Sequence, residues 1–162
     1  MIRFVETDAP MVGEVYEKMD NMLRQIKDIV QEKDPNLYDI IHKCVCAQWN
    51  KLNVPLHALV YILMPKYYSP SWLVQLAPGS GIRVKPHTDP EVSTRYMQAL
   101  DKLVLDKECA NLRLELGRYF TSTGVFGSLH AMEYRDRFDA ITWWDAYGGV
   151  DMANVRYTNK GN

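Results

Sequence analysis

The sequence has few cysteines, no long apolar run and almost no net charge. Its three cysteines, Cys44, Cys46 and Cys109, are too few and too unevenly spaced for a disulfide framework, which indicates a reducing compartment. Nineteen Lys and Arg residues against twenty Asp and Glu residues give a formal net charge of −1. No overall field therefore draws the chain onto nucleic acid or an anionic membrane, although a local basic face remains possible.

Targeting and membrane signals are also missing from the sequence. The longest apolar run, around Leu59 to Met64, is too short to span a bilayer. The first residues, MIRFVETDAP, contain two acids and no apolar stretch, so neither a secretory signal nor a transit peptide is predicted. We therefore expect a soluble protein of the nucleus or cytoplasm that does not contact a membrane.

What is present predicts a helical fold. With 162 residues, of which 47% are hydrophobic and 11% aromatic, the chain can bury a core of its own. No sustained alternation of apolar and polar residues indicates a strand. We predict an all-α fold: an irregular bundle of about five to seven helices with one long loop rich in proline and glycine. Residues 1–149 are expected to form a single helical domain, and residues 150–162 a flexible tail.

The first predicted helix begins near Val12 and follows Pro10, with Thr7 or Asp8 as its cap. Its apolar residues recur in steps of three and four on one face: Val12, Val15, Met19, Met22, Ile26 and Ile29. This pattern covers fewer than three heptads, which favours an amphipathic helix packed within the fold over a coiled coil.

Three further helices are marked by prolines. Asp34 and Pro35 begin the second helix, which runs towards Leu52, and Pro55 begins a strongly apolar third helix that Pro65 should end. This third helix is the expected centre of the core. Pro70, Pro78, Gly79, Gly81 and Pro86 then predict the long loop over residues 67–88. Asp89 and Pro90 mark the start of the fourth helix.

The C-terminal half predicts a long helix and two short ones. The long helix starts near Asp106 and should bury Cys109, Leu112, Leu116 and Tyr119. After a turn over residues 121–127, Ser128 and Asp139 are the expected caps of the two short helices. The last helix carries Trp143, Trp144 and Tyr147, and ends at Gly148 and Gly149.

Three blocks of this sequence resemble plant hAT-family transposases. The segment WNKLNVPLHALVYILMPKYY carries the family pattern at Trp49, Pro55, Leu56, His57, Ala58, Pro65 and Tyr68, with Gln48 in place of the usual arginine and Met64 in place of the asparagine. The second block comprises Phe126, Gly127, Ala131, Arg135, Trp143, Trp144, Tyr147 and Gly148. The opening Met11 to Glu14 resembles the start of a long helix of the family. Together the blocks cover about 150 residues in the family order.

This resemblance implies a helical scaffold without the family's catalytic acids. In hAT transposases an RNase H-like core with three acidic residues is interrupted by a helical insertion, and the last acid lies beyond the WW-containing helix. Residues 150–162 depart from that pattern and contain no serine-rich Glu-Arg motif. We therefore expect no catalytic activity. The alternative is a fragment of a transposase whose active site lies outside this sequence.

No residue cluster predicts a cofactor or a metal site. Cys44 and Cys46 lie two apart, so on a helix they point to different sides and cannot both face one ion. His57 matches the family's histidine, but on an apolar helix a hydrogen-bonded core histidine is the more common outcome. A small nucleic-acid-binding module would need a cluster of basic residues near the paired tryptophans. The candidates are Lys102, Lys107, Arg113, Arg118, Arg135 and Arg137, with acids interspersed among them.

We therefore predict that the chain acts by binding another protein, either a second copy or an unrelated partner. A regulatory, inhibitory or protective role is compatible with such binding. If a parent domain lost its catalytic core, it would expose an apolar surface that needs a new partner. The expected contact residues are Val15, Met19, Met22 and Ile26 of the first helix, and Trp143, Trp144 and Tyr147 of the last helix.

Overall fold

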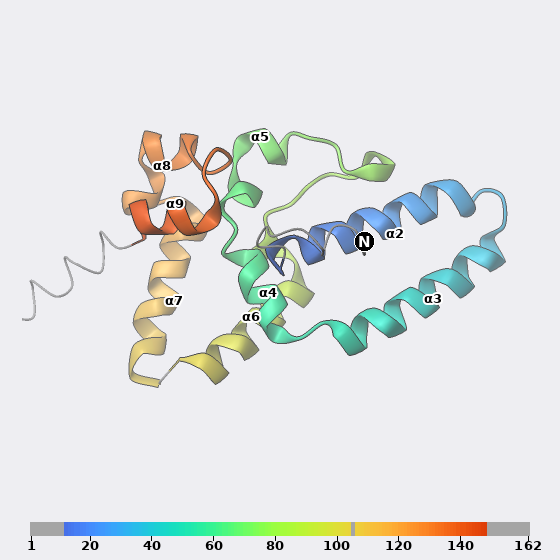
Figure 1. Cartoon of the computed structure of the whole chain (residues 1–162), viewed down its shortest axis with the longest axis horizontal. Helices are drawn as coiled ribbons and strands as arrows, with labels where there is room; N and C mark the ends of the chain where they lie inside the picture. The colour runs from blue at the N-terminus through green and yellow to red at the C-terminus, as the bar shows by residue number, and fades with distance from the viewer. Residues whose placement is uncertain (1–11, 105, 149–162) are drawn as a thin grey trace, which may run out of the picture.

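The computed structural model describes residues 12–104 and 106–148, and this part of the chain is built from helices without strands (Figure 1). Its α-helices are α2 Val15–Val30, α3 Pro35–Leu52, α4 Pro55–Ile62, α5 Pro70–Leu73, α6 Pro90–Leu103, α7 Asp106–Thr121, α8 Leu129–Glu133 and α9 Ala140–Tyr147. The short 3-10 helices are η1 Val12–Glu14, η2 Pro65–Tyr68, η3 Pro78–Ser80, η4 Pro86–Thr88 and η5 Gly124–Gly127. The all-α prediction is confirmed. The predicted number of helices is slightly low, because α5 forms inside the expected loop.

The helices form an elongated arrangement with a hairpin at one end. In Figure 1, α2 and α3 form a splayed hairpin at one end of the molecule, with the turn η3 beside α2, while α7, α8 and α9 gather at the opposite end. The helices α4 and α6 lie between these two ends and pack against each other more extensively than any other pair. No helix of the described residues is both long enough and apolar enough to cross a membrane.

The helix α4 is central, as its apolar sequence predicts. Ala58, Leu59 and Ile62 are buried on it, and Ala99 and Leu100 of α6 are buried against the same region. The helix ends at Ile62, three residues before Pro65, whose ring cannot continue the helical hydrogen-bond pattern.

The predicted caps close the helix starts. The carboxylates of Asp34, Asp89 and Asp139 each accept a hydrogen bond from a backbone N–H in the first turn of the following helix, and Ser128 does the same for α8. Pro35 and Pro90 follow the first two caps, at a position where a missing N–H costs nothing. The predicted caps of the first helix, Thr7 and Asp8, and the tail 150–162 lie outside the described residues.

The segment predicted as a loop contains four short helical turns instead. Pro65, Pro70, Pro78 and Pro86 each occupy the first position of one of these turns. A proline that ends one helix has a φ angle suited to starting another, so closely spaced prolines can divide a segment into short turns. The turn η2 is not at the surface, since Tyr67 and Tyr68 are almost completely buried.

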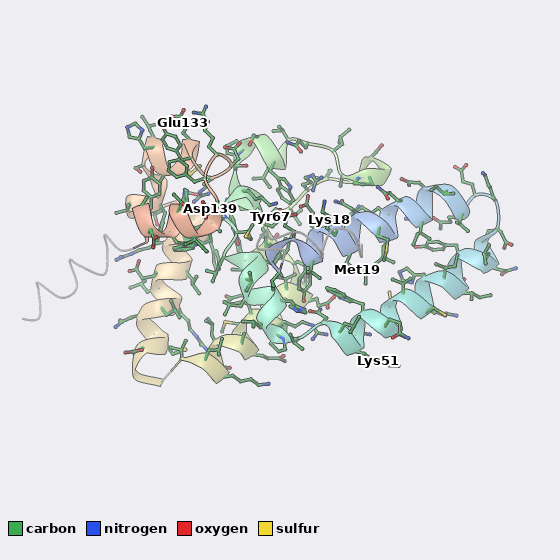
Figure 2. The ribbon with its side chains drawn as sticks, in the orientation of Figure 1. Lys18, Met19, Lys51, Tyr67, Glu133 and Asp139 are labelled. Atoms are coloured by element: carbon green, nitrogen blue, oxygen red, sulfur yellow. The ribbon has the colours of Figure 1, made fainter. Side chains whose placement is uncertain are left out.

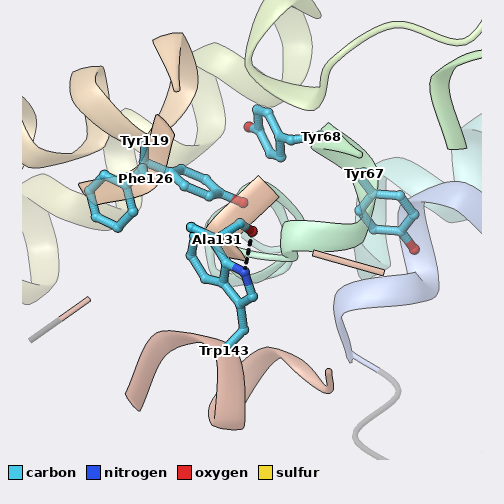
Figure 3. Close-up of a cluster of buried hydrophobic side chains, with 6 residues drawn as sticks. All are labelled: Tyr67, Tyr68, Tyr119, Phe126, Ala131 and Trp143. Atoms are coloured by element: carbon cyan, nitrogen blue, oxygen red, sulfur yellow. Dashed lines mark hydrogen bonds between the residues drawn. The ribbon is translucent and has the colours of Figure 1, made fainter. Parts of the chain in front are cut away.

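An aromatic cluster forms the core at the end that holds α7, α8 and α9 (Figure 3). Its buried members are Tyr67, Tyr68, Tyr119, Phe126, Ala131 and Trp143. Phe126 lies in η5, between two glycines. The centroid of its ring is 5.7 Å from that of Tyr119 and 5.9 Å from that of Trp143. On α7, Leu116 and Tyr119 are buried as predicted, whereas Cys109 and Leu112 are only half-buried.

Candidate protein-interaction surface

The predicted contact residues of the first helix lie on a helix that is covered on several sides. The helix α2 contacts α3, α4 and the turn η3. Met19 is buried, while Val15, Met22 and Ile26 are half-buried. The middle of this apolar face is therefore used inside the fold, while Val12 and Ile29 at its two ends remain exposed.

The two tryptophans of the last helix are bound to the interior. Trp143 is completely buried, and its indole N–H donates to the carbonyl of Ala131 at 2.9 Å (Figure 3). Trp144 donates to the carbonyl of Leu63 at 2.7 Å, which fixes α9 to the end of α4. Tyr147 packs with Trp143 at a ring-centroid distance of 5.3 Å. These residues hold the aromatic core together, which leaves Trp143 inaccessible to a partner in this conformation.

Among the residues that the structure describes, one surface left uncovered is the outer face of α3. None of the eighteen residues of this helix is buried. Its inner side carries half-buried residues such as Val45 and Trp49, and Trp49 packs edge-on against Tyr16 at 5.0 Å. The outer side carries an exposed stripe spaced by three and four residues: Leu37, Ile40, Cys44 and Ala47. In Figure 2, no other described helix packs beside α3 at Lys51, on the outer side of the hairpin.

Leu37, Ile40 and Cys44 adjoin Ile41 and Val45 on one broad apolar face of the helix, of which Ile41 and Val45 are half-buried and the other three are exposed. The side chain of Ile40 is at 60% relative exposure and that of Leu37 at 45%.

The helix α3 is held in place mainly at its C-terminal end, at Asn53. The side-chain oxygen of Asn53 accepts from the hydroxyl of Tyr16 at 2.8 Å, and its amide donates to Glu91 at 3.0 Å. Its backbone carbonyl accepts from Arg95 at 2.8 Å. Asn53 is 4% exposed, so these bonds are shielded from water and tie the end of α3 to α2 and α6.

A second polar node, at Glu17, ties α2 to η2, to α5 and to the segment that follows α5. The carboxylate of Glu17 accepts from the hydroxyl of Tyr67 at 2.9 Å, the indole N–H of Trp72 at 3.2 Å and the guanidinium of Arg83 at 2.9 Å. Burial alone would raise the pKa of Glu17. The hydrogen bonds from Trp72 and Tyr67, with the nearby cations Lys66 and Arg83, outweigh it and hold the pKa below its ordinary value.

Arg135 is a buried cation that pairs with no carboxylate in the described part of the chain. Its guanidinium donates to the carbonyls of Tyr68, Tyr119 and Phe126 at 3.3 to 3.5 Å. It also lies 5.7 Å from the ring centroid of Trp143. Burial lowers the pKa of Arg135 from its ordinary value. Since its contacts come from four separate segments, Arg135 organises the aromatic core and does not face a nucleic acid.

The other candidate basic residues do not gather into one face. Arg113 pairs with Asp101, Arg118 with Glu115 and Arg137 with Glu133, each at 2.8 to 2.9 Å. The side chain of Lys107 lies outside the described residues. Opposite charges so closely interspersed leave little positive field for a phosphate backbone.

The histidines and cysteines are scattered in the same way. Cys44 is exposed, whereas Cys46 is half-buried and lies 3.7 Å from Nε2 of His42 on the adjacent turn. Nδ1 of His57 is buried without a hydrogen-bond partner. Among the described residues, no three His, Cys, Asp or Glu side chains come together as a metal site.

Comparison of this chain with protein-family models, with characterised proteins and with solved structures gives no match. The features that bear on its function are therefore those of its own fold: the free outer stripe of α3, and the polar nodes that hold the hairpin of α2 and α3 to the rest of the molecule.

Proposed function

We propose that this protein acts by binding another protein through the outer face of α3, without catalysing a reaction. One observation carries this proposal: an eighteen-residue helix buries none of its residues and displays a regular apolar stripe to solvent. Burial of such a stripe against a partner removes apolar area from water, which is the main driving force of association.

Charge indicates the chemistry of the partner. Lys43 and Lys51 are exposed on the outer side of α3. Lys51 extends the stripe by one turn beyond Ala47, and Lys43 lies at its edge, whereas Asp39 points away from it. A partner helix with its own apolar stripe flanked by acidic residues would complement both features. We therefore propose an amphipathic, acidic-flanked helix as the occupant. Binding of this kind does not require the transposase ancestry that the sequence resemblance predicts, and that ancestry remains a separate proposal.

A photo-crosslinking amino acid placed at Cys44 in the full chain tests this proposal. We expect crosslinks in extract of the native tissue to a partner helix that carries flanking acids. The Ile40→Asp variant should lose the crosslinks while keeping its circular dichroism spectrum, because Ile40 lies on the surface. The same amino acid at Asp39, on the other side of α3, is the matched control.

The same experiment with the purified chain separates self-association from an unrelated partner. A crosslink between two copies that grows with protein concentration would identify a homo-oligomer. Equal crosslinking from positions 39 and 44, or none from position 44, would contradict docking on this stripe.

A further inference from the structure

A cavity of about 370 Å³ lies on the inner side of the hairpin, between α2, α3, the start of α6 and the segment 77–86. This volume is in the range of small-ligand sites. Four aromatic residues contribute to its walls: Tyr16, Trp49, Tyr61 and Trp72. The cavity is distinct from the outer stripe of α3, since Cys46, Trp49 and Asn50 line it from the opposite side of that helix.

The lining of the cavity carries more negative than positive charge. Its four carboxylates are Glu17, Asp20, Asp89 and Glu91, against the two guanidinium groups of Arg24 and Arg83. Counted over the lining alone, the carboxylates exceed the guanidinium groups by two; Glu91 also pairs with Arg95 at 3.2 Å, and the carboxylate of Asp89 caps α6. An anionic ligand would be repelled, and a cation with a flat or apolar body would be attracted to both the charges and the aromatic rings.

One arginine of the chain itself is already bound by an aromatic ring and a carboxylate in the wall of this cavity. The guanidinium carbon of Arg83 lies 4.7 Å from the ring centroid of Trp72, and Nη1 of Arg83 lies 2.9 Å from Oε1 of Glu17. A ring face combined with a carboxylate is the environment that a planar guanidinium prefers. The walls of this cavity are thus suited to arginine.

A second carboxylate in the lining is available for exchange. Asp20 pairs with Arg24 at 2.8 Å, but both side chains are more than one-third exposed, so the pair contributes little stability. The segment 77–86 approaches Arg24 closely, because a Cβ atom at Gly81 would lie 2.2 Å from Nη1 of Arg24. Ile82 and Val84 line the same cavity and are exposed, so they can contact the residues beside an incoming arginine.

We propose that this cavity binds the guanidinium group of an arginine side chain presented by a partner polypeptide. The carboxylate of Asp20 exchanges Arg24 for the incoming guanidinium, while the aromatic side chains of Tyr16 and Trp49 bound the site. Arg83 and Glu17 remain paired and keep the segment 77–86 in place. This site is independent of docking on the outer stripe of α3.

Titration of the full chain with N-acetyl-L-arginine amide tests the proposal, with the indole N–H signals of Trp49 and Trp72 followed by NMR. We expect saturable shifts of both signals. The citrulline analogue, which has the same shape without the charge, should cause none. The Asp20→Asn variant should bind the arginine amide roughly fivefold more weakly, since it loses one ion pair. The Asp39→Asn variant, changed on α3 outside the cavity, should bind it as the wild type does.

Three results would overturn the assignment. The first is the absence of saturable shifts at Trp49 and Trp72 in a chain that is folded by circular dichroism. The second is equal binding of the citrulline analogue, which would remove the charge from the explanation. The third is equal binding of N-acetyl-L-lysine amide, which would show a general cation site. None of these results depends on position 44, so failure here and failure of docking on α3 are distinguishable.

Discussion

The indole N–H of Trp143 donates to the carbonyl of Ala131 at 2.9 Å, and both residues are completely buried. This bond connects α9 to α8 across a turn and satisfies a carbonyl that water cannot reach. The ring of Trp143 also packs on Tyr119, at a centroid distance of 5.7 Å. A single side chain thus combines apolar area with a directional bond in the middle of the aromatic core.

Replacement of Trp143 by phenylalanine should therefore lower the free energy of unfolding by about 2–4 kcal/mol. The variant leaves a cavity and removes the only donor described for the carbonyl of Ala131 within residues 12–148. Urea denaturation followed by circular dichroism measures the change. Ile141→Ala on the same helix is the control, and it should change the free energy by less than about 0.5 kcal/mol because Ile141 is exposed. Equal effects of the two variants would contradict the central role of Trp143.

Arg135 should not tolerate replacement by lysine. A compact ammonium group cannot reach the three backbone carbonyls that the planar guanidinium contacts, and it is more strongly hydrated than a guanidinium. We expect Arg135→Lys to destabilise the fold by about 2–3 kcal/mol, as for other buried groups that lose their partners. Arg137→Lys keeps an exposed pair with Glu133 and should change stability by less than about 0.5 kcal/mol. Thermal unfolding of both variants provides the comparison.

The Glu17 node predicts a loss of stability in acid. The folded-state pKa of Glu17 lies below its ordinary value of 4.5. Its contribution to stability is complete above pH 4.5, where both states are ionised, and is lost as the pH falls through the folded-state pKa. Glu17→Gln should be less stable than wild type at neutral pH, and this difference should shrink below pH 4.5. Glu32 lies in the exposed turn after α2. The free energy of unfolding of the Glu32→Gln variant should therefore differ from that of the wild type by a constant amount across the same pH range. A constant difference for Glu17→Gln would contradict this assignment.

Two glycines should respond to alanine in opposite directions. Gly79 has a φ angle of 71°, and a Cβ atom there would lie 2.8 Å from the Asp28 carboxylate, so Gly79→Ala should destabilise the fold by about 1 kcal/mol. Gly117 lies inside α7 with no atom within 4 Å of its added Cβ, so Gly117→Ala should stabilise by up to about 1 kcal/mol. Chemical denaturation measures both, and the same sign for the two would contradict the local argument.

The helices were predictable where a cap and a periodic apolar face agree. Asp34, Asp89, Ser128 and Asp139 mark real helix starts, because a side-chain oxygen followed by a free first turn is a local signal. The segment 67–88 was harder to predict, because the prolines that end helices also start the short turns η2 to η4. Whether such a turn is buried depends on contacts with distant residues, such as that of Tyr68 with Tyr119.

The surface was less predictable than the fold. Periodicity shows that a face is apolar, but it does not say whether that face meets the core or the solvent. Trp143 and Met19 were predicted to contact a partner, and both are buried. The exposed stripe around Ile40 borders half-buried residues of the same helix, such as Ile41 and Val45. The cavity depends on Asp20, Trp49 and Arg83, which come together only through tertiary packing.

Because α3 contacts so little of the fold, it can open without disrupting the core of α4 and α6. Its backbone amides, apart from those near Asn53, are expected to exchange with deuterium much faster than those of α4. A partner bound to α3 would suppress this local opening, so part of the association energy would go into ordering the helix. The hairpin would then act as a reporter of occupancy, with exchange rates that fall when a partner is present.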